Sequence, residues 1–416
     1  MTFTRRRFLA VGSAGLLLPA PGLAAPVTAQ ERRFLFVFCN GGWDVGMLFS
    51  PVFSNSAIDV EPGLEPAEVG GITYGRHDDR PMVDAFFAEY ASRTCVINGL
   101  EARSIVHDKC NQLIMTGAAS AGRDDWGTIL GAHASSGTLL PYLHIDGPLY
   151  TAQYPQFAIR LGSNGQLSAL LSGSALQESD LIAQTSLTDT AEQDFLQQQA
   201  AALLEMGGSG QDAAWLATYQ DTLSQTNALQ MESGQLDLAA ATTFPEQLGL
   251  AMDAMQQGVC RCAITRYGGP FGQSWDSHTL NELQSLHFEE LFDYLTDLMG
   301  ELDQRVGASN RRLSDEVTVV VISEMGRHPT LNFNGGRDHW TFTSAMLIGS
   351  GVAGGQSIGG LSSDFMGEPI DLSSGERTDA GIDLQAGHLG ATILALGGVD
   401  PAEYLDDLEP IMAALS

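Results

Sequence analysis

An unbroken β-branched run from Val317 to Ile322 (VTVVVI) constrains the fold more than any other stretch of the chain. A strand with one face in water alternates apolar and polar residues, whereas a strand covered on both faces is apolar throughout, as in parallel sheets flanked by helices. The run ends at Ser323 and Glu324. Because ligands and catalytic groups of open α/β sheets lie at the carboxyl ends of strands, Glu324 is a candidate metal ligand. The alternative is a solvated strand end.

A glycine-rich turn, GGRDHW, follows this strand after a short polar loop. It places Asp338 and His339 side by side, and Arg327 and Arg337 lie close enough in sequence to meet an anion. Together these carboxylate, imidazole and guanidinium groups form a candidate site in which Arg327 binds the anion. An Asp-His pair in a glycine-rich loop also serves simple turn formation, so both interpretations stay open.

A second glycine turn follows the first predicted strand, residues 33–40 (RFLFVFCN). Two glycines directly after a buried strand let the backbone turn sharply and approach a ligand closely. Asp44 then lies at the carboxyl edge of the sheet, where it would share a rim with Glu324.

A third glycine turn follows the strand predicted over residues 259–267 and leads into the segment SWDSH. Its Asp276 and His278 are two residues apart, so both side chains point the same way in an extended segment. A carboxylate and an imidazole on one face are good ligands for zinc or a similar divalent ion.

A helix is expected to begin near His107. Residues 95–100 (CVINGL) predict a strand, a loop follows, and the next stretch has helical spacing up to Gly117. Helix starts attract anions through their free amide groups, so His107 is a candidate catalytic residue on the same rim. Alternatively, Asp108 is a plain helix cap and His107 a surface residue.

The order of the elements indicates the α/β class with a doubly wound, mostly parallel sheet. An amphipathic helix over residues 286–306 returns the chain to the Val317 strand and completes a crossover. Residues of about 180–255 are rich in Gln, Ala, Leu and Glu at helical spacing, which predicts a helical insertion packed beside the sheet. Residues 50–80, rich in Pro, Gly and Asp, predict a long loop.

The amino-terminal 29 residues have the features of a twin-arginine export signal. Arg5, Arg6 and Arg7 precede an apolar run and then small residues up to Ala29. We expect residues 30–416 to form the mature domain and to act in the periplasm or outside the cell. The rest of the sequence contains no run of about eighteen apolar residues, so we expect no transmembrane anchor in the mature chain.

The charge balance excludes one class of partner. Acidic residues number 50 against 20 basic ones, for a net charge of -30, which disfavours nucleic acid as a partner. The five cysteines are too few and scattered for a disulfide scaffold. Cys260 and Cys262 are expected to pack in the interior rather than to bind metal.

The GGWD turn, the helix ending Met-Thr-Gly, the WDSH segment, the SEMGR strand end and the GGRDHW turn together resemble a known family. This is the exported family catalogued as domain of unknown function number fifteen hundred and one, related to the alkaline phosphatase and sulfatase superfamily. The resemblance spans nearly the whole mature chain. It implies an alkaline phosphatase-like sheet with one or two divalent metals beside a nucleophile at a helix start, and hydrolysis of phosphate or sulfate esters.

Carried over by position, the resemblance makes Asp44 the first-strand metal carboxylate, and it matches Glu324 to a strand-end Asp. Carboxylates and imidazoles with an open position suit a hydrolytic metal that acts as a Lewis acid. With zinc as the expected ion, the predicted metal ligands are Asp44, Asp276, His278, Glu324, Asp338 and His339. The predicted catalytic residues are His107 and Arg327.

The chain departs from the superfamily pattern at two positions. His107 stands where phosphatases have Ser or Thr and sulfatases Cys or Ser, and Met325 stands where a His usually follows the strand-end Asp. His107 would then be a nucleophile, a general acid or a further ligand. Two functions stay open. One is a metal-dependent hydrolase of small anionic phosphate or sulfate esters; the other is a catalytically inactive metal- or anion-binding or assembly protein outside the cytoplasm.

Overall fold

A central, mostly parallel sheet organises the computed structural model, which describes residues 27–162, 186–205 and 241–416 and the single residues 167, 216 and 236. In this part of the chain eight strands form the sheet in the order β12-β4-β11-β8-β1-β7-β5-β6, and among them β11 alone runs against the rest. The strands are β1 (Arg33–Cys39), β4 (Thr94–Glu101), β5 (Leu140–His144), β6 (Ala158–Arg160), β7 (Cys260–Tyr267), β8 (Val317–Ile322), β11 (Phe342–Gly349) and β12 (Gln356–Ile358).

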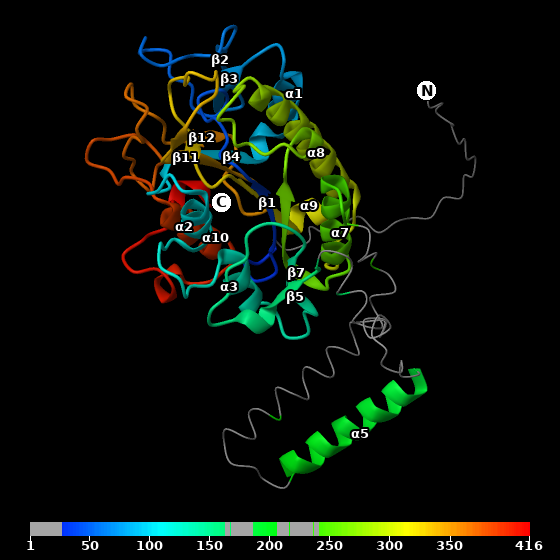
Figure 1. The fold of residues 1–416 in the computed structure, drawn as a ribbon. Coiled ribbons are helices and arrows are strands. Elements are labelled where there is room, and N and C mark those ends of the chain that lie inside the picture. Colours follow the sequence, from blue (N-terminus) through cyan, green and yellow to red (C-terminus); the bar gives the residue numbers. More distant parts are fainter. Residues whose placement is uncertain (1–26, 163–166, 168–185, 206–215, 217–235, 237–240) are drawn as a thin grey trace, which may run out of the picture.

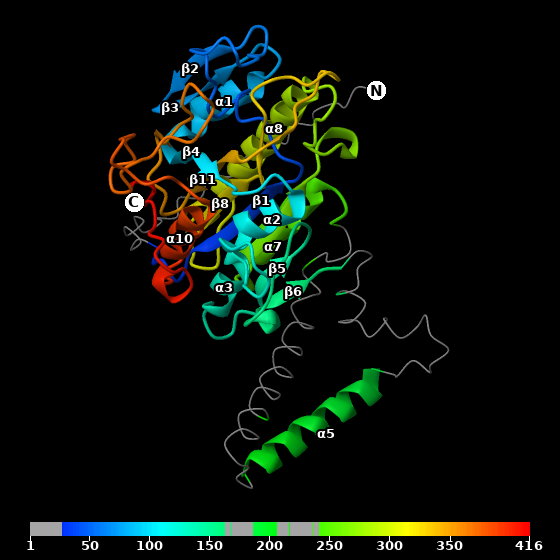
Figure 2. The same ribbon diagram turned by 60° about the vertical axis from the view of Figure 1, so that its left-hand side comes forward.

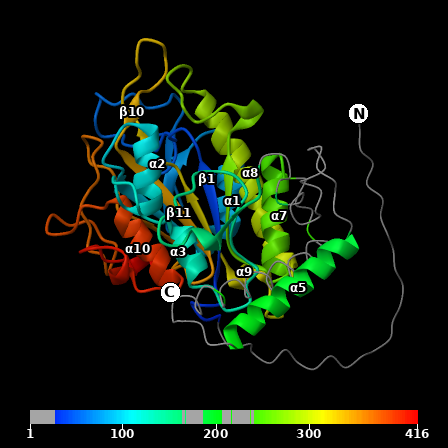
Figure 3. The same cartoon turned by 60° about the horizontal axis from the view of Figure 1, so that its bottom comes forward.

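Helices cover both faces of this sheet, as Figures 1 and 3 show. The main helices are α1 (Pro81–Tyr90), α2 (His107–Thr116), α3 (Trp126–Ala132), α7 (Phe244–Gln256), α8 (Leu283–Gln304), α9 (Leu313–Glu316) and α10 (Ala386–Leu396). Helices α1, α7 and α8 pack on one face, and α2, α3 and α10 on the other. The mixed α/β class with a mostly parallel sheet is therefore as predicted.

Strand β1 shows why the central strands are apolar throughout. Its Phe34, Phe36 and Phe38 join the core cluster under α2, α3 and α10, whereas Leu35 and Val37 join the cluster under α8. All five are fully buried. Because each face meets a helix layer, neither face can carry polar side chains.

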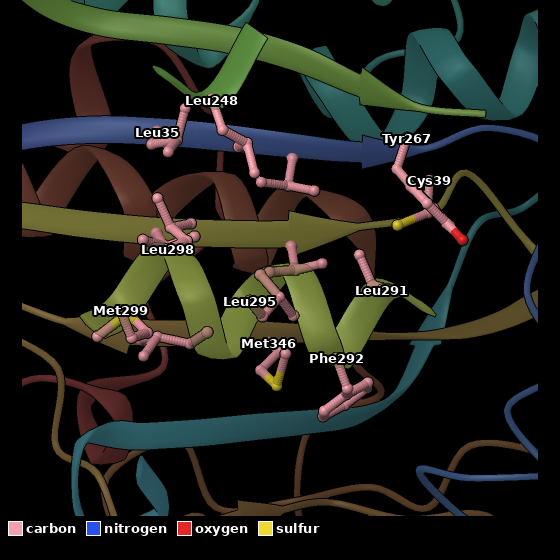
Figure 4. Close-up of a cluster of buried hydrophobic side chains, with 14 of the residues drawn as sticks. Leu35, Cys39, Leu248, Tyr267, Leu291, Phe292, Leu295, Leu298, Met299 and Met346 are labelled. Carbon is pink, nitrogen blue, oxygen red and sulfur yellow. The ribbon is translucent and has the colours of Figure 1, made fainter. Parts of the chain in front are cut away.

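Helix α8 supplies the largest apolar stripe of one layer (Figure 4). Its buried Leu291, Leu295 and Leu298 recur at spacings of three and four residues, with Phe292 and Met299 beside them. This spacing lines one face of an α-helix, and each fully buried side chain of this kind stabilises the fold by about 1.5–3 kcal/mol. The helix lies between β7 and β8 in the chain, as predicted, and begins three residues earlier than expected.

The loop predicted from the sequence over residues 50–80 needs correction. The long loop predicted over residues 50–80 contains a hairpin of β2 (Glu65–Val69) and β3 (Ile72–Arg76), which lies near α1 in Figures 1 and 2. The two residues between the strands, Gly70 and Gly71, both have positive φ, as a tight hairpin turn requires.

Other predictions fall partly outside the described residues. The predicted signal lies almost wholly there, and of the predicted insertion at about 180–255 the structure gives mainly α5 (Ser186–Glu205) and α7. Cys260 and Cys262 are buried and unpaired, which confirms that they pack in the interior. Among the described residues, none of the helices is both long and apolar enough to cross a membrane.

Candidate metal centre

Gly41 lies where the chain segments after the carboxyl ends of β1 and β7 meet. The Trp275 amide donates to the Asn40 carbonyl at 3.1 Å, just beyond the ends of the two strands. At Gly41 φ is +123°, and a Cβ atom there would lie 2.5 Å from the Asp276 nitrogen and 2.7 Å from the Trp275 nitrogen. A side chain is therefore excluded at Gly41 by both backbone conformation and space. The close approach places Asp276 over the carboxyl edge of the sheet.

Four side chains converge above this edge. His107 comes from the first turn of α2, Asp276 follows β7, and His339 begins β10 (His339–Trp340); one ligand atom of each lies within 4.8 Å of the other two. The Asp276 carboxylate is 3.6 Å from His107 Nε2 and 3.4 Å from His339 Nε2. His278 Nε2 lies 2.9 Å from His339 Nε2 and 3.3 Å from Asp276 Oδ1. Figure 3 shows β10 beside α2. We call these four residues the candidate metal centre, shortened below to the metal centre or the centre.

The second ring nitrogen of each imidazole faces an acceptor. An acceptor opposite Nδ1 requires that nitrogen to carry the proton, so Nε2 of the neutral ring presents a lone pair to the centre. Metal-binding histidines are held in this way, with the other ring N–H donated to a carboxylate or carbonyl. The contacts are His107 Nδ1 to Glu324 Oε1 at 2.7 Å, His278 Nδ1 to Asp338 Oδ1 at 3.0 Å and His339 Nδ1 to the Ile105 carbonyl at 2.6 Å.

Two features of the centre fit a bound cation. His107 Nε2 is buried and has no hydrogen-bond partner, which is rare for a polar atom inside a protein. His278 Nε2 and His339 Nε2 face each other at 2.9 Å, and two lone pairs at that distance repel unless a proton or a cation lies between them. Three imidazole nitrogens and one carboxylate are a ligand set that zinc prefers.

Glu324 lies behind the metal centre. It is fully buried at the end of β8 and accepts hydrogen bonds from the Gly41 amide at 2.9 and 3.1 Å and from the Ser323 hydroxyl at 3.2 Å. Its remaining contact is with His107. Glu324, predicted from the sequence to be a ligand, therefore contacts the outer ring nitrogen of His107 and orients that ring.

Asp338 has the corresponding position behind His278. Its side chain is 64% exposed, and Oδ1 also accepts from Asn332 Nδ2 at 3.1 Å. The hydrogen bonds from Asn332 and His278 lower the pKa of Asp338, so the carboxylate is ionised at neutral pH. Asp338 was predicted from the sequence to be a ligand, but in the structure it contacts the outer ring nitrogen of His278.

Arg327 does not fit the predicted role of binding a substrate anion. It is fully buried, and it donates to the carbonyl of Gly42 at 2.8 Å, to that of Arg337 at 3.1 Å and to that of Gly41. The nitrogen that donates to the Gly41 carbonyl, Nη2, also donates to Asp276 Oδ1 at 2.7 Å. These contacts occupy the guanidinium inside the protein, where it holds the glycine turn and orients Asp276.

Asp44 lies apart from the metal centre, contrary to its predicted role as the first ligand. Its fully buried carboxylate accepts from Asn281 Nδ2 at 2.8 Å and from the Gly46 amide at 3.0 Å, and it lies 3.1 Å from Arg337 Nε. These partners satisfy the charge within the fold. Asp44 therefore fixes the loops under the centre.

Charge in the centre is balanced between Asp276 and its neighbours. Burial alone would raise the pKa of Asp276, but its close contacts with His107, His339 and Arg327 hold it well below its usual range. The same contact with Asp276, together with Glu324, raises the pKa of His107 to about 9. A cation that binds at neutral pH would displace the His107 proton.

Two groups that build the centre were missed by sequence reasoning. Asn332 holds the His278 carbonyl at 3.0 Å, and its own Oδ1 accepts from the amides of Asn334 and Gly336. An Asn two residues before another Asn and two glycines is a signal for such a side-chain-closed turn. The Ile105 carbonyl has no sequence signal, because any residue carries it.

A family model described as Protein of unknown function (DUF1501) matches residues 31–405. Among the curated proteins searched, none matches. Solved structures similar to the chain include the PsFucS1 sulfatase from Pseudoalteromonas sp. (TM-score 0.41, 11% identity, 93% of this chain and 73% of that one). Another is the C-terminal periplasmic domain of EcEptC from Escherichia coli (TM-score 0.32, 8% identity, 92% and 86%). Similarities at these TM-scores are too weak to support an argument about activity.

Proposed function

The chain belongs to the family described as Protein of unknown function (DUF1501), and we propose that it is an exported, metal-dependent hydrolase of phosphate or sulfate esters. One observation carries the proposal: three imidazole Nε2 atoms and the Asp276 carboxylate converge at the carboxyl edge of the sheet, each imidazole held from behind by an acceptor. An alkaline phosphatase-like, doubly wound sheet is part of the proposal. The helices on both faces of the sheet support it.

The ligands in this proposal are His107, Asp276, His278 and His339. A divalent ion held there, with zinc as the expected one, would supply Lewis-acid activation of an ester oxygen and of water. Arg327 keeps the Asp276 carboxylate in place and ionised. Glu324 keeps the His107 ring in the tautomer that presents Nε2.

The reaction proposed is direct transfer of the phosphoryl or sulfuryl group to water. The first residue of α2, where the superfamily carries its hydroxyl or thiol nucleophile, is His107. One ring nitrogen of His107 contacts Glu324 and the other faces Asp276 in the centre, so neither points toward an approaching ester. We therefore assign His107 as a ligand, and the reaction proceeds without a covalent enzyme intermediate.

The same substitution favours a second candidate, a metal-binding protein that does no chemistry and acts through partners outside the cytoplasm. In that case the four ligands would hold a cation only for structure or for assembly. The two candidates share the metal centre and differ in turnover.

The decisive experiment combines metal analysis with an ester panel. Protein loaded with zinc, manganese or magnesium is assayed with phosphate and sulfate monoesters. We expect one tightly bound ion per chain and turnover that Asp276→Asn abolishes, with His77→Ala as a control imidazole remote from the centre. A bound ion without turnover of any ester selects the second candidate, and protein that binds none of the three metals contradicts both.

Export is a separate part of the proposal and rests on Arg5, Arg6 and the apolar run behind them. Fusion of residues 1–29 to a reporter that is active only outside the cytoplasm tests it. The reporter should be exported, and the double substitution Arg5→Lys and Arg6→Lys should hold it inside. Export that is indifferent to the two arginines would count against this route.

A further inference from the structure

Exposed apolar side chains occur in the same chain segments as the residues of the metal centre. The structure gives thirteen large apolar side chains as exposed among the residues that it describes, and five of them lie in the segments that carry the ligands. They are Ile105 (56% exposed), Val106 (57%), Leu280 (52%), Leu331 (48%) and Phe333 (97%). We call these five residues the apolar rim.

Two members of the apolar rim lie directly before a ligand. Val106 precedes His107 at the start of α2, and the Ile105 carbonyl receives the hydrogen bond from His339 Nδ1 at 2.6 Å. Their backbone positions are therefore fixed by the metal centre itself. Their side chains remain more than half exposed.

The loop that carries Phe333 is tied to the His278 segment. The Arg337 amide donates to the Ser277 carbonyl at 2.9 Å, and the Asn281 amide donates to the Gly335 carbonyl at 3.0 Å. Asn332, next to Phe333, donates to the His278 carbonyl at 3.0 Å. Phe333 is thus held at the tip of an anchored loop rather than on a free one.

These residues are unfavourable for the isolated protein. A Phe side chain left in water forgoes the stabilisation that its burial would contribute. Leu280 also has a φ of +53°, which side chains other than glycine adopt rarely. Exposed apolar side chains in neighbouring segments are typical of a surface that binds a ligand or a partner.

We propose that the substrate of this centre carries an apolar group, as an alkyl or aryl ester of phosphate or sulfate, and that the apolar rim binds this group. The inference rests on the proposed function. A substrate whose anionic end reaches the four ligands must pass beside Val106 and Leu280, which adjoin His107 and His278. Phe333, almost fully exposed, then covers the far end of the apolar group.

Charge and size favour this occupant over two others. A net charge of -30 opposes docking on an anionic lipid surface. A stable protein interface buries about 800 Å² on each side, more than five side chains supply when four of them are already half covered. An apolar chain of one substrate molecule matches the extent of the rim.

The test is a series of monoesters with methyl to octyl groups, assayed with the zinc-loaded protein. Each added methylene that the rim covers should raise kcat/KM about threefold to fourfold. Phe333→Ser should lower the ratio of kcat/KM for octyl to that for methyl esters at least tenfold. Val306→Ser removes another half-exposed apolar side chain, at the far end of α8, and should keep the ratio.

The outcomes separate this inference from the proposed function. Turnover that does not change with chain length, or an octyl-to-methyl ratio that Phe333→Ser leaves intact, overturns the apolar rim alone. If none of the esters in the series is hydrolysed, both the proposed function and the apolar rim are overturned. Binding of the wild type, but not of Phe333→Ser, to phosphatidylcholine vesicles would assign the rim to a bilayer instead and overturn it as well.

Discussion

The two ends of the central sheet carry buried polar groups of opposite kinds. At the carboxyl end, His107 Nε2 has no hydrogen-bond partner and the four side chains of the candidate metal centre face one another. At the amino end, Arg261 on β7 is 4% exposed and donates at 2.7 Å to each of the carbonyls of Leu130, His133 and Gly397. These carbonyls lie at the carboxyl-terminal ends of α3 and α10, where the backbone supplies few N–H donors. Polar groups at the amino end bind other parts of the fold, whereas those at the carboxyl end face one another.

The strongest way to break this comparison is to remove a ligand. His339→Ala deletes one Nε2 atom of the centre, and zinc affinity should fall by more than a hundredfold, beyond the tenfold to hundredfold typical of outer-shell changes. The free energy of unfolding of the metal-free protein should change by less than about 1 kcal/mol, because no buried partner is orphaned deep in the core. Competition with a chromophoric chelator and urea denaturation measure the two quantities. Unchanged zinc affinity would remove His339 from the centre.

The amino end should respond in the opposite sense. Arg261→Gln leaves buried helix-end carbonyls without donors, so the free energy of unfolding should fall by about 3 kcal/mol or more. Zinc affinity of the folded variant should stay within about twofold of the wild type. Arg377→Gln is the matched control, because Arg377 is 59% exposed and its pair with Glu368 contributes at most about 1 kcal/mol. A loss of metal affinity in Arg261→Gln would show that the two ends are coupled.

A smaller effect separates ligands from the acceptors behind them. Asp338→Asn keeps the shape of the side chain but weakens the hold on His278 Nδ1, and zinc affinity should fall about tenfold. Asp364→Asn, at an exposed position in another loop, should leave the affinity unchanged. If Asp338→Asn loses as much affinity as His339→Ala, Asp338 is itself a ligand, as first predicted from the sequence.

The smallest effect concerns His287, a buried imidazole beneath the carboxyl end whose ring packs on Trp275. Burial lowers the pKa of His287 to about 4. Between pH 6.5 and 4 the unfolded chain therefore binds a proton that the folded chain does not, so stability falls as the pH falls. His287→Gln should flatten this dependence by up to about 1 kcal/mol per pH unit in metal-free protein. Denaturation curves at pH 7, 6 and 5 measure it, and an unchanged slope would contradict the assignment.

The strands and the segments that carry the centre could be predicted from the sequence. Which carboxylates face the centre and which lie behind or apart from it could not. The continuous apolar runs predict β1, β7 and β8, and glycine turns behind them predict where Asp276 and His278 lie. Whether a carboxylate faces a cation or an arginine depends on contacts between segments far apart in the chain. Asp44 meets Arg337 and Asn281, residues more than 200 positions away, so no local pattern distinguishes it from Asp276.

The hairpin of β2 and β3 had a local signal that a composition argument overlooked. Two glycines between short runs that contain Val, Ile and Tyr are typical of a two-residue hairpin turn. The apolar rim is a different case. A sequence shows Phe333 in a polar loop, but its exposure follows only from the fold of the loop on the His278 segment.

The ligands of the metal centre come from three stretches of chain, and the separation between Asp276 and His339 alone is 63 residues. A cation held by all of them would act as a cross-link that closes long loops, so the loaded protein would resist heat and proteases more than the empty one. With the ion at a hundred times its dissociation constant, that resistance corresponds to about 2.7 kcal/mol. If the chain is exported as proposed, loading with the ion before export would then determine how well the folded protein survives outside the cytoplasm.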